Sequence, residues 1–205
     1  MPIIQTTKQL RPRDEHDHYP TPLPFALAAL EPLNKPTCIL DIGAGAGVFG
    51  QAARELWTGV TITGIELRAV TRPKWYDFWY LGSLFDFDSP PAFDLVMGNL
   101  PYKYAEQGVR IGVGWLEQGG VMQNLLRLAF LEGQARGAGF YRELPPYRVN
   151  VCSARPSFTG NGKTDATAYA NFYWRKGWQG ETALGWTMTS AEQSQKQLQL
   201  FEGAA

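Results

Sequence analysis

A polar tetrapeptide at the end of an apolar run carries the groups best suited to chemistry in this chain. The run over 93–98 has the composition of a buried strand, and Asn99-Leu100-Pro101-Tyr102 follows it directly. The side chain of Asn99 offers a carbonyl oxygen. Pro101 restricts the residue before it, so the backbone carbonyl of Leu100 is held in place. Tyr102 adds a flat ring, and two acceptors beside a stacking surface suit a planar ring with an exocyclic amino group.

A glycine-rich loop between an expected strand and an expected helix predicts a nucleotide-binding unit. The apolar segment 37–42 contains Asp41 and runs into Gly43, Gly45 and Gly47 before an expected helix over 48–56. Glycines let a backbone approach a ligand closely, and a helix N-terminus supplies free N–H groups. A second strand over 60–65 ends at Glu66, whose carboxylate can accept both hydroxyls of a ribose.

The loop by itself leaves two ligand classes open. Gly45, Gly47 and Gly50 match the spacing of the dinucleotide-binding pattern, so a nicotinamide dehydrogenase is one alternative. However, Asp41 places a carboxylate beside the loop, where a pyrophosphate requires close and uncharged packing. A carboxylate suits an ammonium or sulfonium group better, which favours S-adenosylmethionine as the ligand.

The elements that would position these groups form an open α/β sheet. We expect a third strand to end over 81–85, after an aromatic segment 76–80 that is helical or irregular. Because ligands bind at the carboxyl ends of strands in such sheets, Gly43, Glu66, Ser83 and Asn99 should point into one crevice. A short helix ending near Glu31 precedes the first strand, and Thr21 is its expected cap.

Further helices and strands are expected after the tetrapeptide. The pattern predicts a helix that begins within 103–107 and ends at Gly119-Gly120. It then predicts a strand over 121–128, a helix over 129–136, and strands over 147–152 and 166–174. The chain therefore has the element order of a mostly parallel open sheet with helices on both faces.

Length and composition favour one cytoplasmic domain. The chain has 205 residues, of which 44% are hydrophobic and 19% charged, as in an ordinary globular protein. We expect a flexible arm over 1–18, a single domain over 19–188 and a polar tail over 189–205. No apolar run approaches the roughly 20 residues of a membrane helix, and the first residues lack a signal-peptide pattern. We therefore expect no membrane partner. Cys38 and Cys152 lack metal-ligand spacing, so we expect them to be buried reduced thiols and expect no bound metal.

The distribution of charge leaves the partner open. The formal net charge is zero, but the stretch 127–176 has eight basic and three acidic residues. This excess is either scattered surface charge or a basic face for phosphates. A polar loop over 153–165 contains Lys163 and one large apolar residue in its middle, Phe158. Phe158 is either a packing anchor or a surface for stacking a base.

Together these motifs resemble those of class I S-adenosylmethionine-dependent methyltransferases, and specifically the adenine-specific DNA methyltransferases of bacteria and phages. The resemblance covers about 19–174 and rests on four stretches: Tyr19-Pro20-Thr21-Pro22, Asp41-Ile42-Gly43-Ala44-Gly45-Ala46-Gly47, Glu66 and Asn99-Leu100-Pro101-Tyr102. It extends less specifically through 155–160 and 162–169. The implied fold is the Rossmann-like class I methyltransferase fold.

The resemblance also implies the cofactor site. Tyr19 and Thr21 would help to hold the methionine end of S-adenosylmethionine. Asp41 and the backbone at Gly43, Gly45 and Gly47 would line its amino-acid and ribose portions, and Glu66 would bind the ribose hydroxyls. An acid commonly contacts the cofactor adenine at the end of the third strand. Ser83 occupies that position here, with Asp86 as the alternative.

The implied reaction is methylation of the exocyclic nitrogen (N6) of adenine in double-stranded DNA. Asn99 and the Leu100 carbonyl would accept the amino hydrogens of a flipped-out base, and Pro101 completes the loop. Tyr102 would stack on the base, with Phe158, Lys103 and Lys163 as further substrate contacts.

Leu100 stands where most members of this DNA family have proline. The resulting Asn-Leu-Pro-Tyr sequence resembles the loop of ribosomal RNA adenine dimethyltransferases. Methylation of RNA adenine or of a protein glutamine amide is therefore an alternative. A catalytically silent module that binds nucleotide or DNA is another.

Overall fold

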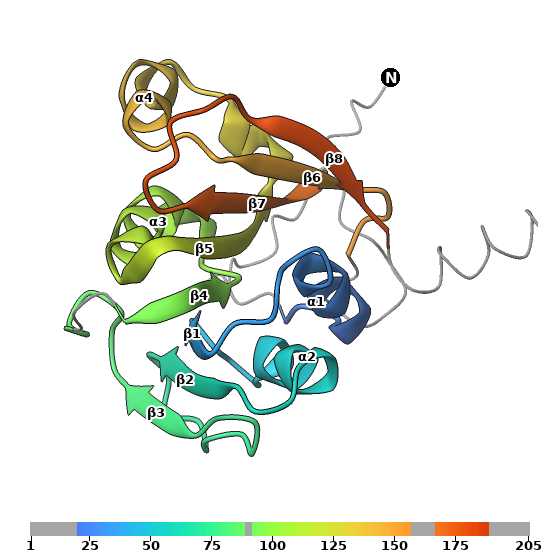
Figure 1. Ribbon diagram of the computed structural model, residues 1–205, viewed down its shortest axis with the longest axis vertical. Helices are drawn as coiled ribbons and strands as arrows, with labels where there is room; N and C mark the ends of the chain where they lie inside the picture. Colours follow the sequence, from blue (N-terminus) through green and yellow to red (C-terminus); the bar gives the residue numbers. More distant parts are fainter. Residues whose placement is uncertain (1–19, 89–91, 157–166, 189–205) are drawn as a thin grey trace, which may run out of the picture.

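Eight strands form one open sheet in the described part of the chain, which comprises residues 20–88, 92–156 and 167–188 of a computed structural model (Figure 1). Their order across the sheet is β3-β2-β1-β4-β5-β7-β6-β8. They are β1 (Cys38–Ile42), β2 (Thr61–Glu66), β3 (Phe78–Leu81), β4 (Phe93–Gly98), β5 (Leu116–Arg127), β6 (Arg148–Cys152), β7 (Tyr169–Arg175) and β8 (Ala183–Thr187). Neighbours are parallel except at β7, which is antiparallel to both β5 and β6. The expected mostly parallel sheet is confirmed.

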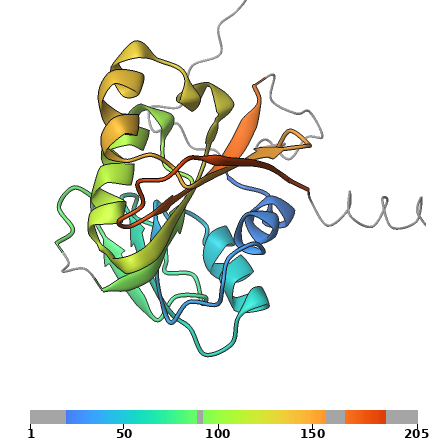
Figure 2. The ribbon, with the colours of Figure 1, turned by 45° about the horizontal axis from the view of Figure 1, so that its top comes forward.

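Helices cover both faces of this sheet. On one face lie α1 (Leu23–Leu30) and α2 (Val48–Leu56), and on the other lie α3 (Ala105–Gly114) and α4 (Tyr141–Glu143) (Figure 2). Short helical turns are η1 (Tyr102–Tyr104), η2 (Leu128–Leu131) and the π-helical η3 (Arg136–Phe140). Because helices pack on both sides, the central strands β1 and β4 are buried almost throughout, as is usual for parallel sheets.

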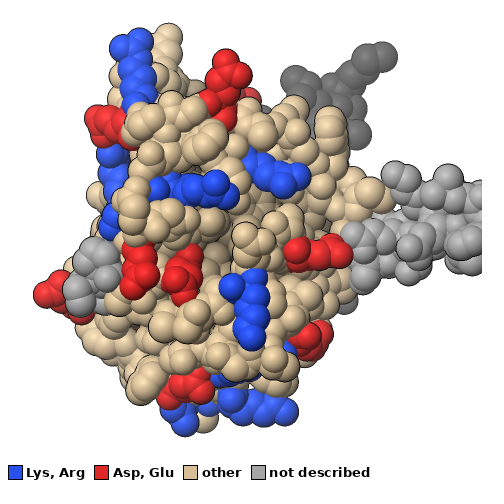
Figure 3. Space-filling view, in the orientation of Figure 1, with Lys and Arg blue, Asp and Glu red and all other residues tan. Residues whose placement is uncertain are grey.

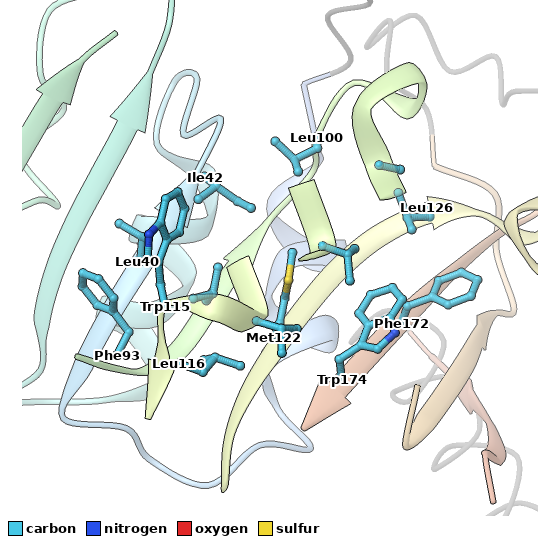
Figure 4. Packing of buried hydrophobic residues seen from close by; sticks show 14 of the residues in the cluster. Leu40, Ile42, Phe93, Leu100, Trp115, Leu116, Met122, Leu126, Phe172 and Trp174 are labelled. Carbon is cyan, nitrogen blue, oxygen red and sulfur yellow. The ribbon is translucent and has the colours of Figure 1, made fainter. Parts of the chain in front are cut away.

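The sheet separates the two larger apolar clusters of the described core, and a small third cluster contains Leu125, Cys152 and Tyr169. The cluster on the α3 side contains Leu100, Met122, Phe172 and Trp174 (Figure 4). The cluster on the other side packs the alanines of α1 and α2 against β1, β2 and β4. Leu100 therefore belongs to the core although it lies two residues beyond the end of β4, and its side chain anchors the tetrapeptide.

The expected strand over 93–98 and the helix over 48–56 are confirmed with the same bounds, and the strands over 37–42, 60–65, 147–152 and 166–174 are confirmed to within three residues. The third strand lies earlier than expected, at Phe78–Leu81, where the sequence suggested a helical or irregular segment. Aromatic side chains fit a pleated surface well, and this segment pairs in parallel with β2.

The prediction that Gly119 and Gly120 end a helix is wrong. The helix α3 ends at Gly114, and both glycines lie inside β5. Gly119 has a φ of 81°, and the register between β4 and β5 shifts between Phe93 and Leu95. The glycine pair therefore permits an irregularity in the strand, as glycines in bulges do.

The helix expected over 129–136 is also wrong in position. The chain forms the turn η2 and then a helical segment that continues through η3 into α4. Gly133 has a φ of 117°, which interrupts helical geometry. Arg136 then donates to the carbonyl oxygens of Phe130 and Glu132, which satisfies backbone groups at the break. The edge strand β8 was not expected at all.

Candidate functional site

A cavity of about 460 Å³ opens at the carboxyl ends of β1, β2 and β4. Many of the residues singled out in the sequence line it: Thr21, Gly43, Gly45, Glu66, Ser83, Asn99, Leu100, Pro101 and Lys103. The expectation that the ends of these strands share one crevice is therefore confirmed. Leu67, Arg68, Phe85 and Tyr104 also line the cavity, and the sequence did not indicate them.

The side chain of Asn99 bonds to a residue that is far from it in the sequence. Its side-chain Nδ2 donates a hydrogen bond of 3.0 Å to Thr21 Oγ1, across 78 positions of the chain. This bond directs the amide nitrogen towards Thr21 and turns Oδ1 away from it. The prediction that Thr21 caps α1 is wrong, because Pro22 is the N-cap residue and no side chain caps the helix. Thr21 serves the tetrapeptide instead.

Leu100 is held on several sides. Its side chain is only 1% exposed, and an added Cβ at Gly43 would lie 3.5 Å from its Cδ2. A Cβ at Gly108 in α3 would overlap the same leucine, so glycine is needed there for this close approach. The Leu100 N–H donates to Oδ1 of Asn124 at 3.4 Å. The backbone at Leu100, whose carbonyl is one of the expected acceptors, is therefore held firmly in place.

Tyr102 lies beside the cavity rather than in its lining. The guanidinium of Arg127 lies over its ring, with Cζ 4.7 Å from the centroid. The Tyr169 ring is 6.0 Å away at 46°. Tyr102 thus has a fixed ring plane supported from β5 and β7. Closer to the cavity, Phe85 and Tyr104 meet edge to face with centroids 5.6 Å apart.

The glycine loop is shaped both for a ligand and for a tyrosine beneath it. Gly43, Gly45 and Gly47 all have positive φ, and α2 begins directly after Gly47. Gly43 and Gly45 line the cavity, whereas Gly47 does not. A Cβ at Gly50 would lie 2.7 Å from the Tyr76 ring. The later glycines of the pattern, Gly47 and Gly50, therefore make room for Tyr76.

Asp41 lies beneath the loop and does not line the cavity. Its carboxylate is 1% exposed, and Tyr76 Oη donates to Oδ2 at 2.6 Å. Burial raises the pKa of Asp41 to about 7, with the Tyr76 hydrogen bond opposing the shift. Among the described residues, Oδ1 has no hydrogen-bond partner. The sequence-based placement of Asp41 beside the cofactor stays a prediction, and any contact would pass through the loop.

The Asp41–Tyr76 pair makes stability depend on pH. The pKa of Asp41 is raised in the folded protein, so its contribution favours folding most at low pH and is lost as pH rises towards 7. Tyr76→Phe removes the donor that supports the charged form. We expect it to lower the free energy of unfolding by about 1–3 kcal/mol at pH 8 and by clearly less at pH 5. Urea unfolding at both pH values measures this.

Tyr80→Phe is the matched control for that substitution, because the half-buried Tyr80 lies on β3 and makes an edge contact with Phe87 rather than a bond to Asp41. It should show no such pH dependence. An equal loss for Tyr76→Phe at pH 5 and pH 8 would contradict the role assigned to the buried pair.

Glu66 presents an ionised but engaged carboxylate. Oε2 accepts from the Gly45 N–H at 2.7 Å, and Oε1 accepts from the Arg68 N–H at 2.9 Å and from its Nε at 2.8 Å. Burial alone would raise the pKa of Glu66, but the hydrogen bonds from Arg68 and Gly45 outweigh it and lower the pKa. A ligand hydroxyl at this carboxylate would have to share or displace Arg68.

The third strand leads to Ser83 in the cavity wall. Ser83 Oγ accepts a hydrogen bond from the Phe85 N–H at 3.1 Å. Asp86, the alternative contact for the cofactor adenine, does not line the cavity. Tyr19, Phe158 and Lys163 fall outside the described residues, as do the expected arm over 1–18 and the expected tail over 189–205.

The charges on the face shown in Figure 3 are mixed, with Lys and Arg side chains interleaved with Asp and Glu. Elsewhere in the described residues, Arg110 forms ion pairs with both Glu106 and Glu143. In the described ranges, no three metal-ligating side chains gather into a site. Nor does any described helix have the length and apolarity needed to cross a membrane. Cys152 is buried and Cys38 partly buried, and both are free thiols.

Comparison with known proteins places the fold. No family model and no curated protein matches the sequence. A predicted O-methyltransferase from Agrobacterium tumefaciens is 18% identical, with a TM-score of 0.56 over 81% of this chain and 85% of that one. A protein assigned as a class I S-adenosylmethionine-dependent methyltransferase from Listeria monocytogenes is 13% identical, with a TM-score of 0.57 over 86% and 67%. A protein assigned as an RNA methyltransferase from Pyrococcus horikoshii is 14% identical, with a TM-score of 0.53 over 78% and 87%.

These likenesses establish the Rossmann-like class I methyltransferase fold for this chain. At such identities a shared fold says nothing by itself about the substrate.

Proposed function

We propose that the protein transfers a methyl group from S-adenosylmethionine to the exocyclic nitrogen (N6) of adenine in DNA. The observation that carries the proposal is the position of Asn99. It is tied to Thr21 at 3.0 Å in the wall of the same cavity that contains Glu66 and the glycine loop. The carboxylate proposed to bind the nucleoside and the oxygen proposed to accept from the amino group would therefore share one pocket.

The residues of the cavity fit this cofactor. Its volume of about 460 Å³ is in the range of small-molecule sites. Glu66 offers an ionised carboxylate for ribose hydroxyls, Ser83 offers a hydroxyl for the adenine edge, and the exposed Leu67 offers an apolar surface for the adenine ring. Gly43 and Gly45 leave the space beside the loop free of side chains for the amino-acid portion, while their N–H groups donate to Ile65 O and Glu66 Oε2. S-adenosylmethionine supplies an electrophilic methyl group when bound there.

The tetrapeptide then acts on the target amino group. The lone pair of an adenine amino nitrogen is delocalised into the ring, which makes the nitrogen a poor nucleophile. Oδ1 of Asn99 and the Leu100 carbonyl would accept its two hydrogens, which favours tetrahedral nitrogen and offsets developing positive charge. The rigid seat of Leu100 in the core keeps the acceptors positioned, and positioning supplies much of the rate.

The target base must be unpaired to reach this loop, because its amino group is blocked inside a duplex. We place the extracted base against Tyr102. Contacts with Arg127 and Tyr169 hold the plane of that ring. Phe158 and Lys163 remain proposed contacts, and Lys103 at the cavity rim is a proposed phosphate contact. We also propose a single cytoplasmic domain over 19–188.

RNA adenine is the second candidate substrate. Leu100 replaces the proline usual in the DNA enzymes, and one solved structure of similar fold is assigned as an RNA methyltransferase. The Tyr-Pro-Thr-Pro element before α1 favours DNA, and its Thr21 contact with Asn99 links that element to the loop.

A methyl-transfer assay decides between these substrates. The protein is incubated with radiolabelled S-adenosylmethionine and with duplex DNA, single-stranded DNA, RNA or protein, and the nucleosides are then analysed by mass spectrometry. We expect N6-methyladenine in DNA. Label in RNA alone would transfer the proposal to the second candidate, label in protein alone would exclude both, and no label would favour a silent binding module.

A further inference from the structure

A buried amide on β5 takes no part in the proposed reaction, yet it touches the catalytic loop. Asn124 is 0% exposed and lies on the strand next to β4. Its neighbours on the same face, Met122 and Leu126, are members of the apolar core (Figure 4). Asn124 is therefore flanked by apolar side chains, which offer its amide no strong hydrogen-bond partners.

The hydrogen bonds of Asn124 do not suit a purely structural role. Oδ1 accepts from the Leu100 N–H at 3.4 Å, and Nδ2 has no partner among the described residues. A buried amide nitrogen without a partner is costly, and an apolar residue of the same size would avoid that cost. The fold alone does not require asparagine here, whereas the loop does receive a bond from it.

We infer that Asn124 is a positioning residue for the catalytic loop, an inference that rests on the proposed function. Its bond holds the peptide plane between Asn99 and Leu100. The Leu100 side chain is locked in the core, and Pro101 keeps Leu100 out of the helical region. These three restraints together set the direction of the Leu100 carbonyl, which is one of the two proposed acceptors.

Gln123, the preceding residue, provides a matched control. It is also 0% exposed, but it lies on the opposite face of β5 and donates to Asn171 Oδ1 at 2.9 Å. Asn124→Leu and Gln123→Met each replace a buried amide by an apolar side chain of similar size. Only the first removes a contact with the loop.

The test measures the rate of methyl transfer and the hydrogen exchange of the Leu100 amide. We expect Asn124→Leu to lower kcat about tenfold, since a small misorientation of a reacting group has effects of this order. Its KM for S-adenosylmethionine and its binding of S-adenosylhomocysteine should change less than about twofold, because Asn124 does not line the cavity. Gln123→Met should leave kcat within about twofold, whatever it does to stability.

Hydrogen exchange of the Leu100 amide is the readout that does not depend on activity. We expect Asn124→Leu to accelerate it about tenfold relative to the wild type and to Gln123→Met. Unchanged exchange, or an unchanged kcat in the folded variant, overturns the inference. If the leucine variant does not fold, Asn124→Ser removes the amide without adding volume and takes its place. A wild type that methylates no acceptor refutes the proposed function, while the exchange rates still decide whether Asn124 holds the loop.

Discussion

Asn99→Ala is expected to lower kcat by about 100- to 1,000-fold, the cost usually found when one preorganised hydrogen-bonding group is removed from a reaction site. The substitution deletes the side-chain acceptor, and the Leu100 carbonyl cannot replace it. Binding of S-adenosylhomocysteine should stay within about threefold, because Glu66, Ser83 and the glycine loop are untouched. Single-turnover transfer and isothermal titration separate the two effects.

Thr21→Val tests how Asn99 is oriented. Valine has nearly the shape of threonine but cannot accept the 3.0 Å hydrogen bond from Asn99 Nδ2. The amide can then rotate, and we expect a loss of kcat of about tenfold, smaller than for Asn99→Ala. If Asn99→Ala transfers methyl groups as fast as the wild type, the loop is not the reaction site. If Thr21→Val alone has no effect, the orientation of Asn99 depends on other contacts.

The unit β1–α2–β2 and the strand β4 could be predicted because their signals are local. Apolar runs, positive-φ glycines and the acid at the end of β2 stand next to one another in the sequence. The common edge of parallel strands then brings Gly43, Glu66, Ser83 and Asn99 together without further information. This reasoning predicts which residues share a cavity, but not how each side chain is held.

The supports of the site could not be predicted because they join distant segments. Thr21 and Asn99 are 78 positions apart, Asp41 and Tyr76 are 35 apart, and Leu100 and Asn124 are 24 apart. No local pattern pairs them. Thr21 has the position and chemistry of a helix cap, and only its hydrogen bond from Asn99 in the folded chain shows its other use.

Glycines caused the main errors in the fold for a related reason. Gly119-Gly120 suggested the end of a helix, and Gly133 was expected to lie inside one, but the conformation at each depends on the partner strand or side chain. At Gly119 the partner β4 turns it into an irregularity within β5. At Gly133 the hydrogen bonds that Arg136 donates to the carbonyls of Phe130 and Glu132 permit a late helical segment. A glycine in the sequence indicates that the backbone can adopt an unusual conformation, but tertiary contacts decide which conformation it adopts.

Glu66→Gln is expected to weaken the binding of S-adenosylmethionine and S-adenosylhomocysteine by about 10- to 100-fold, because hydrogen bonds to a charged group are worth about 1.5–3 kcal/mol. Glutamine keeps the size of the side chain but offers one neutral acceptor. Since Arg68 and Gly45 hold the pKa of Glu66 below its usual value, wild-type affinity should not vary between pH 6 and 8 through this group. It should fall only as acid conditions protonate the carboxylate.

Arg68 decides how the ribose would be accepted. Both Glu66 oxygens already receive donors from the chain, and the Arg68 side chain is 31% exposed, so the ion pair is only a modest competitor. If the ribose hydroxyls displace Arg68, Arg68→Met should bind S-adenosylhomocysteine as tightly as the wild type or up to about fivefold more tightly. Glu66→Gln should lose affinity in the same titration. Equal affinity of wild type and Glu66→Gln would show that this carboxylate does not bind the cofactor. Weaker binding by Arg68→Met would show instead that Arg68 remains in place and orients the carboxylate for the ligand.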